Sequence, residues 1–200
     1  KPLMLQNVLF CPVLTWLSTA LREQGVERFF VCCPASYQEE ALACFSSAEQ
    51  VTVSDNRADL LAFLEGEEET LVVPGAAVPV DSAGQNEVYR ASGSVLAHSL
   101  ETGAEEVEGA RSVPGFTPIT TFKGLNSMQF LARAQILREL LAGGVCVMDP
   151  NNTYVDPRVR VGAGTMLLPG TILRGGTVIG TDCQIGPNSM LTDCTVGDGV

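Results

Sequence analysis

A six-residue period governs the hydrophobic positions in the last fifty residues of the chain. Each unit opens with an aliphatic residue, and a small or β-branched residue follows four positions later, with the seventh unit one residue short. The opening residues are Val155, Val161, Leu167, Leu173, Ile179, Ile185, Leu191 and Val196, and the followers are Val159, Thr165, Thr171, Thr177, Cys183, Ser189 and Thr195. This hexapeptide period predicts a parallel β-helix with one aliphatic side chain per flat side pointing inward. We expect Gly162, Gly170, Gly180 and Gly186 to take its turns.

The N-terminal region alternates helical and strand-like patterns. Apolar spacing predicts helices over 13–24, closed by Gly25, and over 57–64, with strands over 26–33, 51–53 and 70–73. Ser36, with Glu39 three positions later, forms a capping box and predicts a helix over 36–45. Strands that alternate with helices are typical of a parallel, doubly wound layer.

Two further segments lie between these regions. Residues 81–115 hold Gly and Ser clusters and an acidic patch of Glu105, Glu106 and Glu108, so we expect a loop or partly ordered stretch with a solvated acidic face. Residues 126–141 predict a connecting helix capped by Asn126 and ended by Gly143 and Gly144. Its expected apolar face consists of Phe130, Leu131, Ala134, Leu137, Leu140 and Leu141.

Charge and composition narrow the class of protein. The 200 residues include 12 Lys and Arg against 23 Asp and Glu, a formal net charge of -11. This excess of negative charge argues against nucleic-acid and anionic-membrane partners. No apolar run approaches the roughly 20 residues of a membrane helix. The chain starts without Met and stops within the repeats, so we expect a soluble fragment of a longer protein.

Few residues carry the usual chemistry of an active site. The seven cysteines show no CxxC motif or zinc spacing, and we expect reduced thiols that act as small buried hydrophobes. His98 is the single histidine, and no nucleophile pattern surrounds it. Asp182, Asp193 and Asp198 lie on the repeats, but exposed carboxylates titrate near 4 and are weak bases at neutral pH.

Several motifs resemble one known family. The runs Gly124-Leu125-Asn126 and Gly144-Val145, and residues 149–156 followed by hexapeptides, resemble the arm and β-helix start of bifunctional N-acetylglucosamine-1-phosphate uridylyltransferase/glucosamine-1-phosphate N-acetyltransferases of the GlmU type. Pro2-Leu3, residues 8–12 and residues 71–80 are similar to parts of that family's nucleotidyltransferase domain. The resemblance implies an α/β Rossmann-like remnant, a connecting helix and a left-handed parallel β-helix. The corresponding divisions are a shortened nucleotidyltransferase-like domain over 1–115, a helical arm over 116–148 and a β-helix over 149–200 that is truncated at its C-terminal end.

The chain lacks several charged residues that the family has in its nucleotidyltransferase domain. Leu3 and Cys11 stand where the family has lysines, Ala76 stands where it has a metal-binding aspartate, and Asn126 matches its other metal ligand. Phosphoryl chemistry needs cations around the phosphates and carboxylates to hold magnesium. The segment that binds uracil and sugar is also missing between Val53 and Gly115. We therefore expect an inactive nucleotidyltransferase domain, in which Asn126 alone does not hold magnesium.

The resemblance also implies a function. We expect a transferase family of UDP-N-acetylglucosamine and cell-wall peptidoglycan supply, with acetyl-CoA as co-substrate and acetyl transfer to glucosamine 1-phosphate in coils beyond Val200. No catalytic residue is therefore assigned within this chain. Sugar phosphates and nucleotides are the expected small-molecule partners, without nucleic acid or membrane, in a cytoplasmic bacterial homotrimer. Two alternatives are a non-catalytic scaffold or regulatory paralogue and a hexapeptide acyltransferase with another acceptor.

Overall fold

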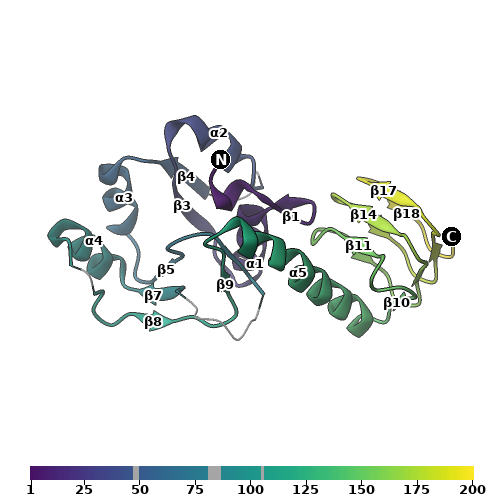
Figure 1. The fold of residues 1–200 in the computed structure, drawn as a ribbon. Coiled ribbons are helices and arrows are strands. Elements are labelled where there is room, and N and C mark those ends of the chain that lie inside the picture. Colours follow the sequence, from purple (N-terminus) through teal and green to yellow (C-terminus); the bar gives the residue numbers. More distant parts are fainter. Residues whose placement is uncertain (47–49, 81–86, 105) are drawn as a thin grey trace. The chain divides into compact units, whose positions relative to one another are not determined.

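The computed structural model describes residues 1–46, 50–80, 87–104 and 106–200, and these form two compact units. Unit 1 comprises Lys1–Gln6 and Pro12–Phe122, and unit 2 comprises Asn7–Cys11 and Lys123–Val200. Figure 1 follows their elements along the chain. Within the described ranges, none of the helices combines the length and apolar composition needed to cross a bilayer.

Unit 1 begins with the elements that the sequence predicts. After the short 3-10 helix η1 (Leu3–Leu5) come α1 (Val13–Glu23), β3 (Arg28–Cys32), β4 (Gln50–Ser54), α3 (Arg57–Leu64) and β5 (Thr70–Val72). Strands β3 and β4 pair in parallel from Arg28↔Gln50 to Cys32↔Ser54. Gly25 follows α1 with φ +87°, a conformation that favours glycine, and so ends the helix as expected.

The expected doubly wound parallel layer is confirmed only for the β3–β4 pair. Antiparallel pairing joins β5, β7 (Tyr89–Ala91) and β8 (Arg111–Ser112), and also β6 (Ala77–Val78) with β9 (Thr117–Pro118). Alternation along the chain does not determine which strands become neighbours, and here distant strands meet. A Rossmann-like arrangement is therefore not confirmed.

The predicted capping box at Ser36 is wrong. Ser36 lies inside the 3-10 helix η2 (Ala35–Tyr37), and α2 (Gln38–Leu42) begins only after it. The residue that precedes α2 is Tyr37, and its side chain makes no capping hydrogen bond. Pro34 comes just before η2 and has φ -56°, close to the value that its ring favours, so the proline rather than the serine sets the beginning of this segment.

The prediction of a loop over 81–115 is wrong for most of its described part. A helix, α4 (Gly93–Thr102), lies between β7 and β8. Its residue Leu96 is buried with Leu64 and Ala91, and Gly103 ends it with φ +71°. This packing stabilises a helix that begins with Gly93 and Ser94, residues typical of loops, so the sequence pattern does not reveal it. Residues 81–86 and Glu105 lie outside the described residues.

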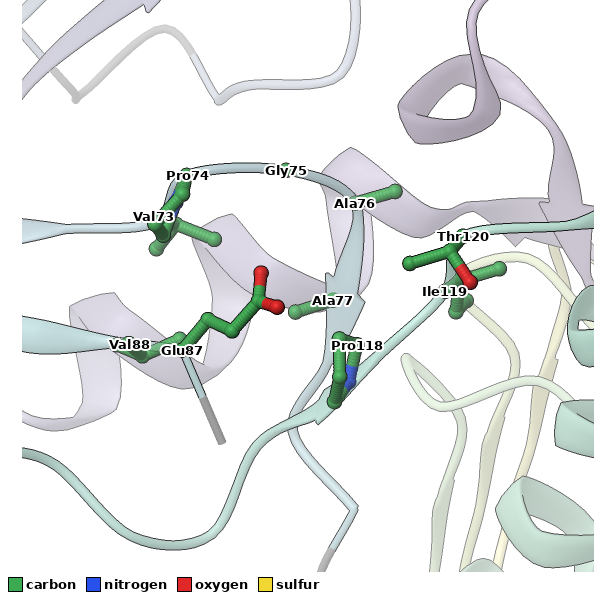
Figure 2. A pocket seen from close by; sticks show the side chains of 10 residues that line it. All are labelled: Val73, Pro74, Gly75, Ala76, Ala77, Glu87, Val88, Pro118, Ile119 and Thr120. Carbon is green, nitrogen blue, oxygen red and sulfur yellow. The ribbon is translucent and has the colours of Figure 1, made fainter. Parts of the chain in front are cut away.

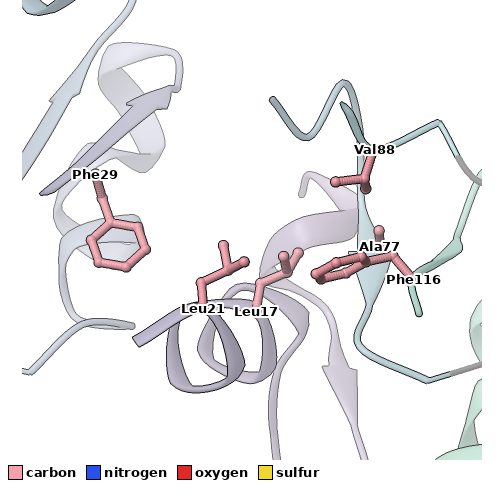
Figure 3. Close-up of a cluster of buried hydrophobic side chains, with 6 residues drawn as sticks. All are labelled: Leu17, Leu21, Phe29, Ala77, Val88 and Phe116. Atoms are coloured by element: carbon pink, nitrogen blue, oxygen red, sulfur yellow. The ribbon is translucent and has the colours of Figure 1, made fainter. Parts of the chain in front are cut away.

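One core cluster of unit 1 joins α1 to strands β3 and β6 (Figure 3). Leu17 and Leu21 of α1 lie in one cluster with Phe29 of β3 and Ala77 of β6. Val88 and Phe116 complete the buried set. Burial of this apolar surface fixes β6, and with it the loop around Ala76.

Unit 2 contains the long helix α5 (Phe122–Ala142). The helix is confirmed, but it begins four residues before Asn126, so the predicted cap is wrong. The expected apolar face is also wrong in large part, because Phe130 is 68% exposed and Leu131, Ala134 and Leu141 are exposed as well. The buried residues instead follow each other at helical spacing: Leu125, Met128, Ala132, Ile136 and Leu137.

Three parallel sheets form the predicted β-helix. The first contains β10 (Cys146–Val147), β13 (Met166–Leu167) and β16 (Gln184–Ile185), and the second contains β11 (Tyr154–Val155), β14 (Ile172–Arg174) and β17 (Met190–Thr192). The third contains β12 (Arg160–Val161), β15 (Val178–Ile179) and β18 (Thr195–Val196). Partners such as Tyr154↔Ile172 lie 18 residues apart, which is three hexapeptides per coil. The first coil is longer, with Cys146↔Met166, and the last is one residue shorter, with Val178↔Thr195.

Aliphatic and threonine side chains fill the β-helix as the period predicts. Val155, Leu167, Leu173 and Ile179 are buried, and Thr165, Thr171 and Thr177 are 0% exposed. The threonine hydroxyls donate to backbone carbonyls, to Gly180 at 2.8 Å and to Leu168 and Arg174 at 2.7 Å each. These bonds satisfy polar groups that would otherwise destabilise the interior.

The prediction for one small position is wrong. The period places Thr195 there, but Thr195 pairs with Val178 and is exposed. Cys194 takes the place instead, since its carbonyl accepts from the amide of Val178 as that of Thr177 accepts from Arg160. The missing residue of the seventh unit therefore lies before Cys194.

The four glycines assigned to turns divide into two pairs. Gly170 and Gly186 have φ of +78° and +106°, as a left-handed turn requires. Gly162 and Gly180 do not have positive φ, so the prediction of a left-handed turn is wrong for them. They allow close packing between coils instead, because a Cβ on either would meet the backbone of the next coil. Asp182, Asn188 and Asp193 take left-handed corners instead.

Candidate functional site

A small cavity in unit 1 surrounds the position where the family resemblance places a metal-binding aspartate (Figure 2). Its lining comprises Val73, Pro74, Gly75, Ala76, Ala77, Glu87, Val88, Pro118, Ile119 and Thr120. The cavity measures about 40 Å³, whereas sites for drug-sized ligands usually occupy roughly 300 Å³ or more. The cavity can therefore hold a few water molecules but is too small for a sugar nucleotide.

Ala76 itself is buried and held through its main chain. The amide of Ile119 donates to the carbonyl oxygen of Ala76 at 2.6 Å, next to the β6–β9 pair. Its methyl group offers no ligand atom for a cation. Among the described residues that line the cavity, Glu87 supplies the carboxylate, and one such group is a poor match to the several oxygen ligands that magnesium takes.

Asn126, the predicted magnesium ligand, is exposed on α5 in unit 2. Across the described part of the chain, no group of three or more His, Cys, Asp or Glu side chains could hold a metal ion. Magnesium requires a near-octahedral set of oxygen ligands, usually with one or two carboxylates. The residues described therefore do not fit this ion.

Leu3 and Cys11 stand where the family resemblance implies lysines, and both are uncharged. Leu3 lies in η1 and is half-buried, and Cys11 is buried in β2 (Cys11–Pro12). Lys1, two residues before Leu3, forms an ion pair with Glu40. Its charge is thus partly neutralised by a carboxylate within unit 1.

His98 and the cysteines do not assemble a reactive centre in the described residues. His98 is exposed on α4. All seven cysteines are free, and Cys11, Cys33, Cys44 and Cys183 are buried, as expected for small hydrophobic residues, whereas Cys32 and Cys146 are exposed. Burial raises the pKa of the Cys33 and Cys44 thiols, so these groups stay protonated and weakly nucleophilic at neutral pH.

The motif at residues 149–156 forms a tightly bonded turn at the start of the β-helix. The Asp149 carboxylate accepts from the Asn151 amide at 3.0 Å and from the Asn152 side chain at 2.6 Å. The Asn152 side chain is the main reason why the pKa of Asp149 is lowered. Arg133 of α5 donates to the carbonyl of Asn151 at 2.8 Å and stacks over the Tyr154 ring. The motif thus joins α5 to the first coil.

A buried ion pair completes this turn. Asp156 is 0% exposed and Arg158 is 44% exposed, and their side chains make two hydrogen bonds of 2.8 and 2.9 Å. The Asp156 carboxylate also accepts from the amides of Arg158 and Gly175 at 3.0 and 3.2 Å. Hydrogen bonding to Asp156 raises the pKa of Arg158. All these contacts stabilise the coil, and no sequence pattern predicts Arg158 as the partner of Asp156.

The hexapeptide repeats match a known protein family. The bacterial transferase hexapeptide (six repeats) family matches residues 158–193, and it implies the left-handed form of the β-helix. A bifunctional protein GlmU from Caldanaerobacter subterraneus subsp. tengcongensis is 45% identical over 75 residues, which are 38% of this chain and 16% of that protein.

Two further GlmU proteins show the same range of similarity. The protein from Geobacillus sp. is 34% identical over 113 residues, 56% of this chain and 23% of its own length. The one from Nocardia farcinica is 52% identical over 64 residues, 32% of this chain and 13% of its own length. The chain thus spans less than a quarter of each of these relatives. Over the hexapeptide region it is similar to the bifunctional GlmU proteins, and the resemblance predicted from the sequence is confirmed there.

Proposed function

We propose that this chain is part of a transferase of UDP-N-acetylglucosamine biosynthesis, which supplies cell-wall peptidoglycan precursors. One observation carries the proposal: coils that match the transferase hexapeptide family over 158–193 follow directly on the bonded turn of residues 149–156. The curated relatives named bifunctional protein GlmU support it. The proposed divisions are a nucleotidyltransferase-like domain over 1–115, an arm over 116–148 and a β-helix over 149–200.

The proposed activity is acetyl transfer from acetyl-CoA to glucosamine 1-phosphate, for which the described coils serve as the support. A base that deprotonates the sugar amine needs a pKa near neutrality. Asp198 does not suit this role, because hydrogen bonds from Thr181 lower its pKa. Asp193 is engaged as well, since its Oδ1 accepts from the amide of Gly176 at 2.8 Å. We place the catalytic base on coils that follow Val200.

The uridylyltransferase half is proposed to be inactive. Leu3, Cys11 and Ala76 carry no charge at positions where the resemblance implies cations and a carboxylate. The small cavity beside Ala76 supports this proposal, since a nucleotide does not fit into it. Magnesium has no proposed role in this chain.

The family resemblance also supports a proposal for the oligomeric state and the cellular location of the protein. We propose a homotrimer in the bacterial cytoplasm that acts on sugar phosphates and binds neither nucleic acid nor membranes. The formal charge of -11 supports the last part, because phosphate-rich partners are repelled.

Two assays test the proposal. Thiol release from acetyl-CoA with glucosamine 1-phosphate is measured for this chain, for the native full-length protein and for the full-length His98→Ala variant. We expect no activity, activity and undiminished activity. Pyrophosphate release from UTP and N-acetylglucosamine 1-phosphate, with magnesium, should stay at background in all three. Acetyl transfer by the 200-residue chain, or turnover of UTP, would contradict the respective half of the proposal.

The uncharged Leu3, Cys11 and Ala76 also favour a second candidate, a non-catalytic scaffold or regulatory paralogue. A full-length protein that forms trimers but releases no thiol would support this candidate. Thiol release with other amino sugars, but not with glucosamine 1-phosphate, would instead indicate an acyltransferase with another acceptor.

A further inference from the structure

A short hairpin near the N-terminus belongs to unit 2 rather than to the sequence around it. Strands β1 (Asn7–Val8) and β2 (Cys11–Pro12) pair, and residues Asn7–Cys11 group with Lys123–Val200. Leu9, at the turn, has φ +53°, which costs a non-glycine residue free energy. Such a conformation persists only where surrounding contacts hold it.

One side chain of α5 binds the hairpin from both sides of its turn. The side-chain amide of Gln129 accepts from the backbone amide of Leu9 at 2.6 Å and donates to the carbonyl of Asn7 at 3.0 Å. An amide group is suited to this task because it both donates and accepts. The two bonds span 120 and 122 residues of sequence.

The hairpin also contacts the β-helix. The guanidinium of Arg174, at the end of β14, lies over the Phe10 ring at 5.1 Å from its centroid. Val8 and Cys11, on either side of the turn, are buried. The hairpin therefore touches α5 through Gln129 and the middle strand of the second sheet through Phe10.

We propose that residues Asn7–Cys11 act as a strap that holds α5 to the second coil of the β-helix. Arg133 joins the same helix to the first coil through Asn151 and Tyr154. Gln129 lies four residues before Arg133, so both project from one side of α5. The two connections together hold the helix against successive coils. Arg133 supplies the connection to the first coil, and the strap supplies the connection to the second.

Hydrogen exchange tests the strap in the intact chain. The reporter is the amide of Gly175, which follows Arg174 directly and donates to the buried Asp156 carboxylate. We expect Gln129→Ala and Phe10→Ala each to speed exchange at Gly175 about ten-fold, because local opening of the coil becomes easier. The matched control is Ser127→Ala on the same helix, whose hydroxyl donates to the carbonyl of Lys123 within α5 at 3.2 Å, and it should leave Gly175 unchanged.

A second pair of variants keeps the test decisive if Gln129→Ala fails to fold. Leu9→Gly retains the amide and tolerates positive φ, whereas Leu9→Pro lacks the amide and cannot adopt φ +53°. We expect faster exchange at Gly175 only in Leu9→Pro. Unchanged exchange at Gly175 in the strap variants, or an equal increase in Ser127→Ala or Leu9→Gly, would overturn the proposal.

Discussion

Gly162 and Gly180 lie one coil apart, and a Cβ on Gly162 would be 2.6 Å from the carbonyl carbon of Gly180. Backbone atoms of the next coil cannot move away without disturbing the β12–β15 pairing. We therefore expect Gly162→Ala to lower the free energy of unfolding by about 2 kcal/mol, in the range of overpacked interiors. Chemical denaturation measures this change. Gly176→Ala is the control within the β-helix, because a Cβ there would meet only Asp193 Oδ1 at 3.9 Å, an ordinary contact; an equal loss there would contradict the explanation.

The Asp156–Arg158 pair predicts unequal effects of its two partners. Arg158→Ala leaves the fully buried Asp156 carboxylate without its cation, whereas Asp156→Asn keeps an acceptor and leaves a half-exposed guanidinium that water can solvate. We expect Arg158→Ala to cost about 2 kcal/mol of stability, at the low end for buried pairs because Arg158 is partly solvated. Asp156→Asn should cost less. The two free energies of unfolding are compared by urea denaturation, and the reverse order would refute the argument.

Glu69 neutralises two like charges in unit 1. Arg90 and Arg111 lie directly opposite each other on β7 and β8, and the Glu69 carboxylate forms ion pairs with both. Glu69→Gln should lower stability by about 1 kcal/mol or less, since these groups are exposed and screened.

The salt dependence of the stability loss in Glu69→Gln shows whether charge is its cause. At about 1 M NaCl the difference between Glu69→Gln and the native chain should shrink, because the Debye length falls to about 3 Å. Glu68→Gln is the control, because Glu68 is the exposed neighbour of Glu69 in the sequence. This substitution should change the free energy of unfolding little at either salt concentration. A salt-independent loss in Glu69→Gln would show that packing, not charge, is responsible.

The stability of unit 2 should depend on pH through Asp149. Hydrogen bonds from Asn152 and Asn151 lower the pKa of this carboxyl in the folded chain. A group with a lowered folded pKa contributes stability above its unfolded pKa of about 3.9 and loses that contribution as the pH falls through the folded value. We expect the free energy of unfolding to decline below about pH 4, and to decline less in Asn152→Ala, which lacks the main partner. Parallel pH slopes of the two proteins in denaturation would exclude this role of Asp149.

The β-helix could be predicted nearly to the residue because its period is short and fixed. Each hexapeptide sets the inward positions locally, so Leu167, Leu173 and the buried threonines follow from the sequence alone. The error at Thr195 arose where one residue is missing from the period. On α5, by contrast, apolar residues surround the helix, and the 3.6-residue period does not decide between Phe130 and Met128 as the buried position.

Unit 1 and the candidate site depend on contacts that no local pattern encodes. The helix α4 begins with Gly93 and Ser94, which favour a loop, and it is stabilised by packing of Leu96 on Leu64, far away in sequence. The uncharged Ala76 could be identified from the motif, but the size of the cavity beside it depends on Ile119 and Glu87, which come from separate segments. The pairing of Gln129 with Leu9 spans 120 residues and has no sequence signature.

The strap has a consequence for the order of folding. Neighbouring coils close loops of about 18 residues, as between Tyr154 and Ile172, whereas Gln129 and Leu9 close one of 120. The entropy of loop closure makes the longer loop about 2 kcal/mol more costly. The coils and α5 can therefore form early, from contacts close in sequence, and the hairpin joins them late. Within unit 2, the residues that are synthesised first would thus be among the last to reach their native contacts.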